Sequence, residues 1–413
     1  MRTETRDTIV LTAGTGATAL MSLIYLSIAG RMIDAARFGD FTGATAFIAL
    51  CTLALGPING TVAKFTAQYT ARAQFGRIVA LYRAMSRRVA RYGALAFGIG
   101  LLVLLPLSRF LQFESVWPLL LAYVAVYLTV LLCVFRGVLR GVQRYGLLKI
   151  NTFVESVVRL GSGALLLWLF ASVAAGLSAY IVALGVIVIV ARWQIRGILA
   201  DHQPQSLDGA AIRRFSVPIF AMMLTSAALQ NADMLFVKAR FDELQAGTYG
   251  AAFGLARTVG ALFTPFNIMM LPLMTTLYEQ KSATGGAFVR VCVYFLILVS
   301  LPLFVFAVWP NVVVAGMYGN KYAGASGLLF LITLTRVVGF FGHLIGLTFL
   351  SRDDYRFLWW YVPCLFVQLV AMYRLGTTPR SLIIVVLVVQ TGAALLLAAG
   401  LVVTTRRRTR ANG

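Results

Sequence analysis

Apolar residues occupy most of the chain in long runs, and shorter polar segments separate these runs. A run of about 20 apolar residues matches a helix that crosses a hydrocarbon core of about 30 Å. The runs are too long and too uniformly apolar for the alternating strands of a membrane barrel. We therefore predict an all-α polytopic membrane protein with twelve spans, at about 9–30, 41–63, 92–108, 115–135, 150–170, 172–191, 215–237, 247–277, 287–309, 323–350, 357–373 and 381–403.

Composition supports this interpretation and excludes several classes of site. Hydrophobic residues make up 60% of the 413 positions and charged residues only 12%, whereas a soluble domain carries about twice that share of charge. The four cysteines lie apart in different predicted spans, without the close spacing of a disulfide framework or a metal site. We expect no metal and no bound cofactor.

Basic residues are distributed unequally between the two ends of the predicted helices. If the N-terminus lies in the cytoplasm, 24 of the 36 basic residues fall on the cytoplasmic side and eight on the other side. This bias agrees with the positive-inside rule and predicts that both termini are cytoplasmic. It also explains most of the net charge of +22, so nucleic-acid binding is an unnecessary interpretation.

The two halves of the chain resemble each other when one is shifted by 208 residues. The residues that superimpose include the pairs Asp34 and Asp242, Gly39 and Gly247, Pro57 and Pro265, and Asn59 and Asn267. Six spans per unit is an even number, so the two units would insert with the same orientation as a parallel repeat. The polar stretch after Ala191 separates them. We predict a six-helix bundle at 1–198, a cytoplasmic linker at 199–204 and a second six-helix bundle at 205–413.

Three stretches resemble bacterial polysaccharide flippases of the multidrug, oligosaccharidyl-lipid and polysaccharide exporter (MOP) superfamily. The first, NADMLFVKARFDELQAGTYGAAFGLARTVGALFTPFNIMMLPLM, is similar to the family's seventh and eighth helices. Its matching residues are Asp233, Ala246, Gly247, Tyr249, Leu255, Ala256, Arg257, Pro265 and Pro272. The stretch AGRMIDAARFGDFTGATAF resembles the family's first turn, and FRGVLRGVQRYGLLKINTFVESVVRLG resembles its fourth-to-fifth connection. The chain departs from the family at the first turn, where Ile33 and Asp34 replace the usual Leu-Gly.

The resemblance implies a V-shaped molecule with two bundles around a central cavity. Members of the family move a polyprenyl-diphosphate-linked oligosaccharide across the bacterial cell membrane by alternating access, driven by an ion gradient or the membrane potential. The partners it implies are this lipid-linked oligosaccharide, membrane lipids and other polysaccharide assembly proteins. The pathway could be that of O-antigen, capsule or exopolysaccharide.

Three arginines lie about halfway along predicted spans, at Arg159, Arg257 and Arg336. Each costs at least about 2.5 kcal/mol to insert, so each must face protein or water. Together they are candidates for binding a diphosphate, which the guanidinium fork fits. The alternative is local pairing, of Glu155 with Arg159 at i, i+4 and of Asp233 with Arg257 across adjacent helices. Arg336 has no evident acid nearby in the sequence and is therefore our first candidate for a cavity-lining cation.

Polar residues near these spans have competing interpretations. Asn59 and Asn267 each follow a matched proline by two residues, which favours a role at a helix break over a role as a ligand. Asp233 is a candidate carrier of a coupling proton or cation, since burial raises the pKa of a carboxyl group; the alternative is a structural partner.

Three further arginines recur every four residues, at Arg136, Arg140 and Arg144. They share one helix face at the cytoplasmic end of the fourth span. Snorkelling to the membrane surface and topology account for them, and a patch that gathers anionic lipid headgroups is the alternative.

Other functions are less consistent with the sequence. An ATP-driven pump would need a phosphate-binding Gly-x-x-x-x-Gly-Lys-Ser/Thr loop, which is missing. A membrane-embedded glycan polymerase or ligase usually needs a sizeable outer loop, and here each outer loop has about 13 residues or fewer by the predicted spans. A gradient-driven multidrug exporter of the same superfamily would favour an acidic cavity. The exporter and the polymerase or ligase remain the two alternatives to a flippase.

Overall fold

The computed structural model describes residues 2–199, 203–207, 209–264, 266–267, 270, 273–274, 284–352 and 354–412. Within these ranges the regular structure is entirely helical. Ten helices or helix pairs in the described part are long and apolar enough to cross a membrane. Two more helices, α1 (Arg2–Met32) and α9 (Glu243–Ala261), occupy the first and eighth predicted spans. The prediction of a polytopic helical membrane protein is confirmed.

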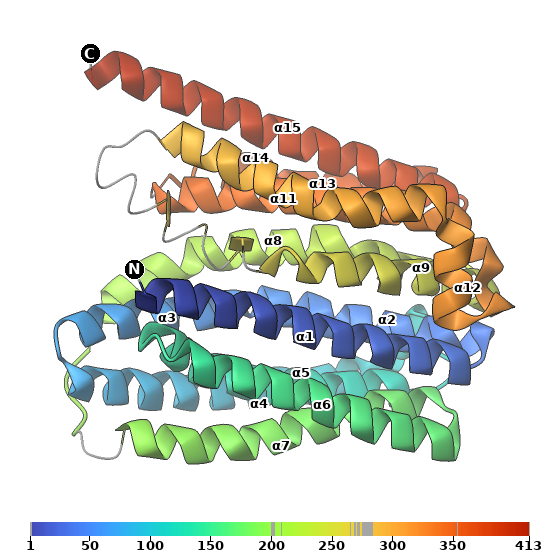
Figure 1. Ribbon diagram of the computed structural model, residues 1–413, viewed down its shortest axis with the longest axis horizontal. Coiled ribbons are helices and arrows are strands. Elements are labelled where there is room, and N and C mark those ends of the chain that lie inside the picture. The colour runs from blue at the N-terminus through green and yellow to red at the C-terminus, as the bar shows by residue number, and fades with distance from the viewer. Residues whose placement is uncertain are drawn as a thin grey trace.

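The first half of the chain forms one bundle, coloured blue to green in Figure 1. After α1 come α2 (Ala35–Ala54), α3 (Gly56–Ala71), α4 (Phe75–Phe110), α5 (Trp117–Gly141), α6 (Tyr145–Phe170) and α7 (Val173–Leu199). Within this bundle α1 packs on α6, α6 on α7, and α3 on α5. We call this unit the N-bundle.

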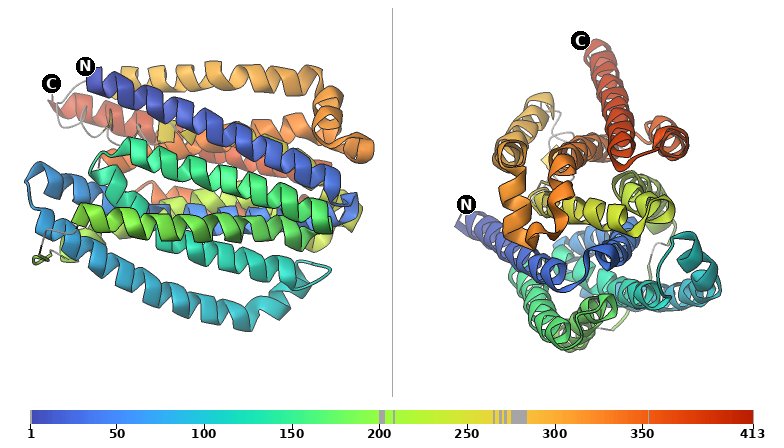
Figure 2. Two further views of the ribbon diagram at one scale, coloured as in Figure 1. Left: turned by 60° about the horizontal axis from the view of Figure 1, so that its bottom comes forward. Right: turned by 90° about the vertical axis from the view of Figure 1, so that its right-hand side faces the viewer.

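The second half forms the C-bundle, which lies beside the first (Figures 1 and 2). It consists of α8 (Gly209–Arg240), α9, α11 (Thr284–Val308), α12 (Pro310–Tyr318), η1 (Asn320–Ala325), α13 (Ser326–Ser351), α14 (Leu358–Leu375) and α15 (Pro379–Asn412). Helix α7 ends at Leu199 and α8 begins at Gly209, near the predicted linker. The two bundles are confirmed, whereas the domain limits at 198 and 205 stay a prediction.

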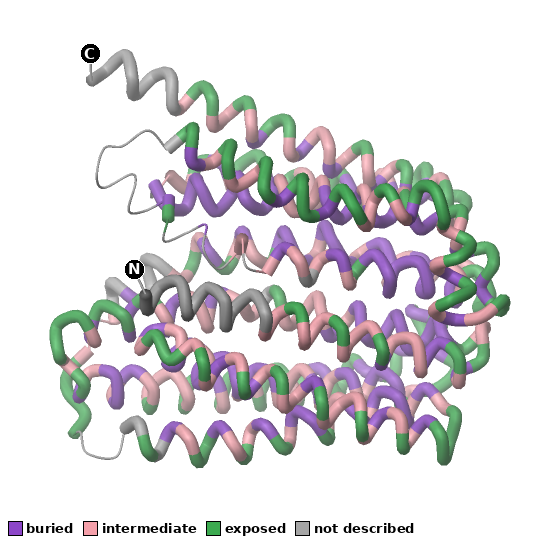
Figure 3. The backbone as a smooth tube through the Cα atoms, in the orientation of Figure 1, coloured by how far each residue is buried: buried purple, intermediate pink, exposed green. Residues whose placement is uncertain are grey.

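The outward faces of the bundles are apolar and exposed, which suits contact with lipid rather than water. Leu102, Ile189 and Leu301 are examples, and their side chains project from α4, α7 and α11. Buried residues instead gather where helices face their neighbours (Figure 3). The core therefore runs between the helices of each bundle and across the contact between the bundles.

Helices α2 and α9 form the centre of the contact between the bundles. Each begins directly after an aspartate, Asp34 and Asp242, and these residues differ by the 208 positions of the predicted repeat. The repeat-related glycines meet at the crossing. A Cβ atom on Gly247 would lie 1.8 Å from the carbonyl oxygen of Ala35, and one on Gly39 would lie 3.0 Å from Ala246. The backbones approach this closely only because glycine has no side chain.

The second predicted span is broken. Helix α2 ends at Ala54 and α3 begins at Gly56, with Pro57 in the first turn of α3. Proline is tolerated there because the first turn of a helix leaves its N–H groups unbonded in any case. The related Pro265 lies outside the described residues, and α9 ends before it at Ala261.

Candidate functional site

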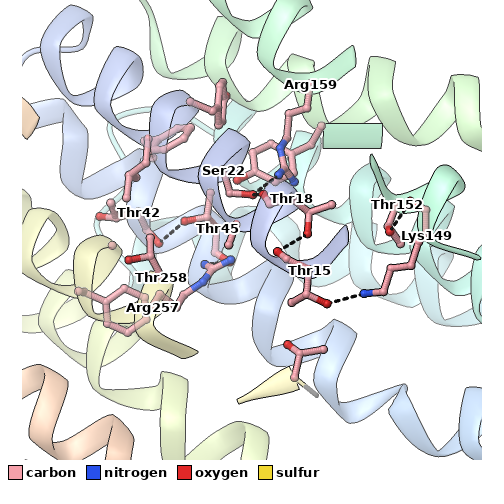
Figure 4. A pocket seen from close by; sticks show the side chains of 18 residues that line it. Thr15, Thr18, Ser22, Thr42, Thr45, Lys149, Thr152, Arg159, Arg257 and Thr258 are labelled. Atoms are coloured by element: carbon pink, nitrogen blue, oxygen red, sulfur yellow. Dashed lines mark hydrogen bonds between the residues drawn. The ribbon is translucent and has the colours of Figure 1, made fainter. Parts of the chain in front are cut away.

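A cavity of about 380 Å³ lies between the two bundles. Its walls come from α1, α2, α6 and α7 of the N-bundle and from α9 of the C-bundle. Hydroxyl side chains form much of the lining, among them Thr15, Thr18, Ser22, Thr42, Thr45 and Thr258 (Figure 4). A cavity with apolar walls and several convergent polar side chains is the default candidate for a binding site.

Three basic side chains, Lys149, Arg159 and Arg257, also line the cavity (Figure 4). No aspartate or glutamate is among the described residues of the lining. The positive charges are therefore not balanced by acids in the cavity wall, and the chamber is suited to an anion.

Arg159 lies on α6 and points toward α1 and α7. One of its terminal nitrogens donates a hydrogen bond of 2.7 Å to the hydroxyl of Ser22. Its guanidinium carbon lies 5.0 Å from the ring centroid of Tyr180 and 5.9 Å from that of Tyr25. The alternative interpretation, that Arg159 pairs with Glu155, is wrong, because Glu155 forms its ion pair with Arg136 of the neighbouring α5.

Arg257 lies on α9, near the centre of the molecule. Its side chain is nevertheless exposed, and because it lines the cavity we interpret this exposure as exposure to the cavity. A terminal nitrogen donates a hydrogen bond of 3.1 Å to the backbone oxygen of Thr45 on α2. The alternative interpretation, that Arg257 pairs with Asp233, is wrong, since that carboxylate binds a different arginine.

The arginine that binds Asp233 is Arg336, which the structure places inside the C-bundle rather than in the cavity lining. It is 2% exposed, forms an ion pair with Asp233 and donates a hydrogen bond to the backbone oxygen of Gln230. The hydroxyl of Tyr249 donates to the same carboxylate at 2.5 Å. The prediction that Arg336 is a cavity-lining cation is therefore wrong, because α13 packs against both α8 and α9 and brings Arg336 to Asp233.

Lys149 is a cavity cation that sequence reasoning missed as a site residue. It lies near the start of α6, among the basic residues that the sequence places on the cytoplasmic side. Its ammonium donates to the hydroxyl of Thr15 at 2.6 Å. Lys149, Thr152 and Arg159 follow at i, i+3 and i+10, which places them on one helix face; this spacing was a usable signal.

The two asparagines beside the matched prolines do not line the cavity. The Asn59 side-chain oxygen is buried without a hydrogen-bond partner among the described residues. The side-chain oxygen of Asn267 lies 3.2 Å from a ring nitrogen of His343, whose other ring nitrogen lies 3.0 Å from Ser226. Asn267 thus belongs to a polar network inside the C-bundle.

Arg136 and Arg140 lie in the last turns of α5, whereas Arg144 lies beyond its end and directly precedes α6, so the three do not share one helix face. Arg136 binds Asn151 and Glu155 on α6, Arg140 is half-buried, and Arg144 is exposed. The buried Nε of Arg140 has no partner within the described part of the chain. A uniform headgroup patch is therefore a poor description of these residues.

At the end of the molecule where α1 ends and α2 begins, direct bonds join the two bundles. We call this region, around Arg31, Asp40, Lys238 and Tyr322, the closed end. Lys238 of α8 pairs with Asp40 of α2 at 2.6 Å, and Arg31 donates to the backbone oxygen of Met317 at 3.0 Å. The Tyr322 hydroxyl donates to the backbone oxygen of Gly30 at 3.1 Å. The cavity lies toward the opposite end, near the start of α6.

Nothing in the described part of the chain forms a group of three or more His, Cys, Asp or Glu side chains that could hold a metal ion. The cavity chemistry therefore depends on hydroxyl and cationic side chains.

Comparisons with known proteins agree with this architecture. The family model described as "polysaccharide biosynthesis protein" matches residues 5–278. No curated protein sequence matches the chain significantly. The resemblance to polysaccharide flippases is thereby supported by a match that spans more than half of the chain.

Solved structures share the fold over nearly the full length. An inward-facing multidrug resistance MATE family transporter of the MOP superfamily has a TM-score of 0.73 at 13% identity, covering 97% of this chain and 99% of its own. The lipid II flippase MurJ in an inward closed conformation has a TM-score of 0.70 at 11% identity, with coverage of 95% and 87%. A MOP superfamily transporter from Pyrococcus furiosus, described by the reverse polarity of its binding pocket, scores 0.67 at 14% identity, with coverage of 95% and 92%.

Proposed function

The chain belongs to the polysaccharide biosynthesis protein family, and from this premise we propose that it is a flippase for a polyprenyl-diphosphate-linked oligosaccharide. It would move this lipid from the inner to the outer leaflet of the bacterial cell membrane. The glycan would then serve the synthesis of O-antigen, capsule or exopolysaccharide, with other polysaccharide assembly proteins as partners.

One observation supports this substrate most directly. The cavity holds Lys149, Arg159 and Arg257, and no acid is among its described lining residues. A diphosphate is the strongly anionic part of the proposed substrate, and guanidinium groups bind phosphate oxygens through paired N–H donors. Hydroxyl groups such as those of Thr18 and Thr42 are donors and acceptors that suit sugars.

The position of the cavity supports loading from the cytoplasmic side. In the proposed topology both termini are cytoplasmic, so the closed end faces outward. The cavity lies between the bundles and toward the cytoplasmic end of α6, where Lys149 contributes its charge. Transport would proceed by rocking of the two bundles about the α2–α9 crossing, driven by an ion gradient or the membrane potential.

The cationic cavity disfavours the exporter alternative. An organic cation would meet three positive charges in a chamber of low dielectric, where repulsion between like charges is strong. The fold shared with MATE transporters does not by itself select a substrate.

Transport in proteoliposomes tests the proposal. The purified chain is reconstituted with a fluorescent undecaprenyl-diphosphate-linked oligosaccharide, and a membrane-impermeant reagent measures the fraction exposed on each face over time. We expect protein-dependent movement of this lipid, and none of a matched lipid that ends in a neutral hydroxyl. Efflux of drug-like organic cations without movement of the glycolipid would overturn the proposal.

A further inference from the structure

Arg159 differs from the buried Arg336 in what surrounds its guanidinium group. We propose that Tyr25 and Tyr180 are positioning residues that hold Arg159 by their ring faces and leave its N–H donors free for phosphate oxygens. The proposal rests on the flippase function above and assigns the way in which that site presents its charge. Tyr25 comes from α1 and Tyr180 from α7, so three helices contribute to the arrangement.

Tyr25 is fixed by its surroundings. It is 2% exposed and its hydroxyl donates a hydrogen bond to the backbone oxygen of Gly176 on α7. Its ring packs against Gly163 of α6, where a Cβ atom would lie 2.3 Å from the ring. The ring also makes an edge contact with Phe41 of α2, at 6.2 Å between centroids. A ring that three neighbouring helices contact is a rigid support.

Tyr180 contacts both Tyr25 and the arginine. Its ring lies 5.8 Å from that of Tyr25 in an edge arrangement, and 5.0 Å from the guanidinium carbon of Arg159. Tyr180 itself is half-buried and lines the cavity. A cation over an aromatic ring is attracted by the negative charge of the ring face. This attraction stabilises the positive charge without using any N–H group.

The donors of Arg159 are consequently underused. A guanidinium group carries five N–H donors, and Arg159 makes one hydrogen bond to a described residue, at Ser22. Its Nε is buried and has no partner in the described part of the chain. Beyond the bond to Ser22, the terminal N–H groups of Arg159 make no hydrogen bond to a described residue, so these are the donors that a ligand in the cavity can use. The acceptor that fits the proposed substrate is a phosphate oxygen.

In the C-bundle a different side chain, at the position that the repeat relates to Tyr25, stabilises the buried arginine. The shift of 208 residues relates Tyr25 to Asp233 and Phe41 to Tyr249. In the C-bundle the guanidinium carbon of Arg336 also lies near an aromatic ring, 4.7 Å from the centroid of Phe253, but the carboxylate of Asp233 accepts one of its N–H groups and compensates its charge. In the N-bundle the aromatic ring at the related position accepts no hydrogen bond of this strength. No acid in the described part of the chain compensates the charge of the arginine that this ring faces.

Substitutions of Tyr180 distinguish the contribution of its ring face from that of its hydroxyl. Tyr180→Phe keeps the ring, Tyr180→Leu removes it, and Tyr180→Met removes it while keeping a long side chain should the leucine variant fail to fold. We expect the phenylalanine variant to bind undecaprenyl diphosphate in nanodiscs like the wild type. Loss of the ring should weaken binding about tenfold, because a desolvated cation–π contact is worth about this factor. In transport, KM should rise and kcat should change little.

A double-mutant cycle distinguishes positioning from a merely structural role. In an Arg159→Gln background, Tyr180→Leu should cause no further loss of undecaprenyl diphosphate binding, because the ring acts through the arginine. Tyr127→Leu, on α5 and outside the cavity lining, is the matched control. Equal losses in both backgrounds, or equal binding by the phenylalanine and leucine variants, would overturn the positioning role alone. If the wild type binds undecaprenyl diphosphate no better than undecaprenol, both the positioning role and the proposed flippase function are contradicted.

Discussion

Basic side chains lie both in the cavity and at the closed end, but the groups that bind them differ between the two regions. At the closed end Lys238 is 2% exposed, and its ammonium lies 2.6 Å from both the Asp40 carboxylate and the backbone oxygen of Gln112. In the cavity, Lys149 and Arg159 bind hydroxyl groups and Arg257 binds a backbone oxygen. The charge of Lys238 is therefore compensated by an acid, whereas the cavity cations are only oriented by neutral groups.

The difference teaches which charges hold the molecule together and which remain for a ligand. A buried ion pair gives little net stability, but removal of one partner leaves an uncompensated charge in a region of low dielectric. The pair at the closed end and the Asp233–Arg336 pair of the C-bundle are both of this kind. The cavity cations have no such partner, so their removal should alter ligand binding more than folding.

The largest expected effect comes from breaking the pair inside the C-bundle. Asp233→Ala leaves Arg336 buried and unpaired, and we expect a loss of about 3–5 kcal/mol in unfolding free energy. Thermal unfolding of the purified protein in detergent measures this. Glu114→Ala is the matched control, because the Arg37–Glu114 pair is about half exposed on each side and should contribute less than about 1 kcal/mol.

Replacing both partners by apolar residues sharpens the same test. Asp233→Leu combined with Arg336→Leu should recover most of the lost stability, since no charge then remains buried. An Asp233→Ala variant as stable as the wild type would contradict the assignment of this carboxylate as a structural partner.

The second effect concerns the cavity. Arg159→Gln combined with Arg257→Gln should lower the transport rate of the lipid-linked oligosaccharide about a hundredfold, with each single change contributing about tenfold. A hydrogen bond to a charged group is worth about 1.5–3 kcal/mol, which supports at least this factor for each arginine. The proteoliposome assay measures the rates, and the unfolding temperature should stay close to that of the wild type.

Arg290→Gln provides the control for a lost charge, since Arg290 is exposed near the start of α11 and outside the cavity lining. A similar fall in transport for Arg290→Gln would mean that net charge, rather than the cavity, determines the rate.

The fold was largely predictable from the sequence, because a membrane span is specified by composition and length alone. The pairing of individual charges was not. Glu155 and Arg159 stand at i, i+4, but Arg136 reaches Glu155 from the next helix. Arg336 appears isolated in the sequence, but Asp233 lies opposite it on α8. Such contacts depend on how far each helix is rotated about its axis, and this rotation is set by packing between helices.

The repeat could be recognised only where function or close packing preserved residues. Gly39 and Gly247 coincide in the sequence, and they pack at the α2–α9 crossing. Tyr25 and Asp233 occupy related positions with different chemistry, so alignment alone gave no reason to compare them. Lys149 was assigned to the membrane surface because it stands at a helix start, although its side chain reaches the cavity.

A third prediction addresses the closed end. Lys238→Met removes the ion pair that joins α8 to α2, and we expect the molecule to open more often at this end. Ala246→Cys, introduced on α9 beside Gly39 in a background without the four native cysteines, reports the opening. A membrane-impermeant maleimide should label this cysteine several-fold faster in the methionine variant. Lys321→Met is the control, because Lys321 is exposed and, among the described residues, bonds one backbone oxygen, that of Arg31. Equal labelling of wild type and Lys238→Met would show that the Lys238–Asp40 pair does not hold this end closed.

The smallest expected effect is that of Lys149→Met, which tests where the cavity charges matter most. Lys149 stands near the start of α6, and a single hydroxyl, that of Thr15, orients its ammonium. An ammonium is a compact point charge that attracts an anion without the two-point geometry of a guanidinium group. We therefore expect KM for the lipid-linked oligosaccharide to rise about threefold with kcat unchanged, an effect that high salt should reduce because screening weakens exposed charges most. Lys149→Arg should restore KM. A loss of kcat as large as that of Arg159→Gln would instead give Lys149 the same role as the two arginines. It would then contradict the interpretation that Lys149 attracts the anionic substrate while Arg159 and Arg257 bind it.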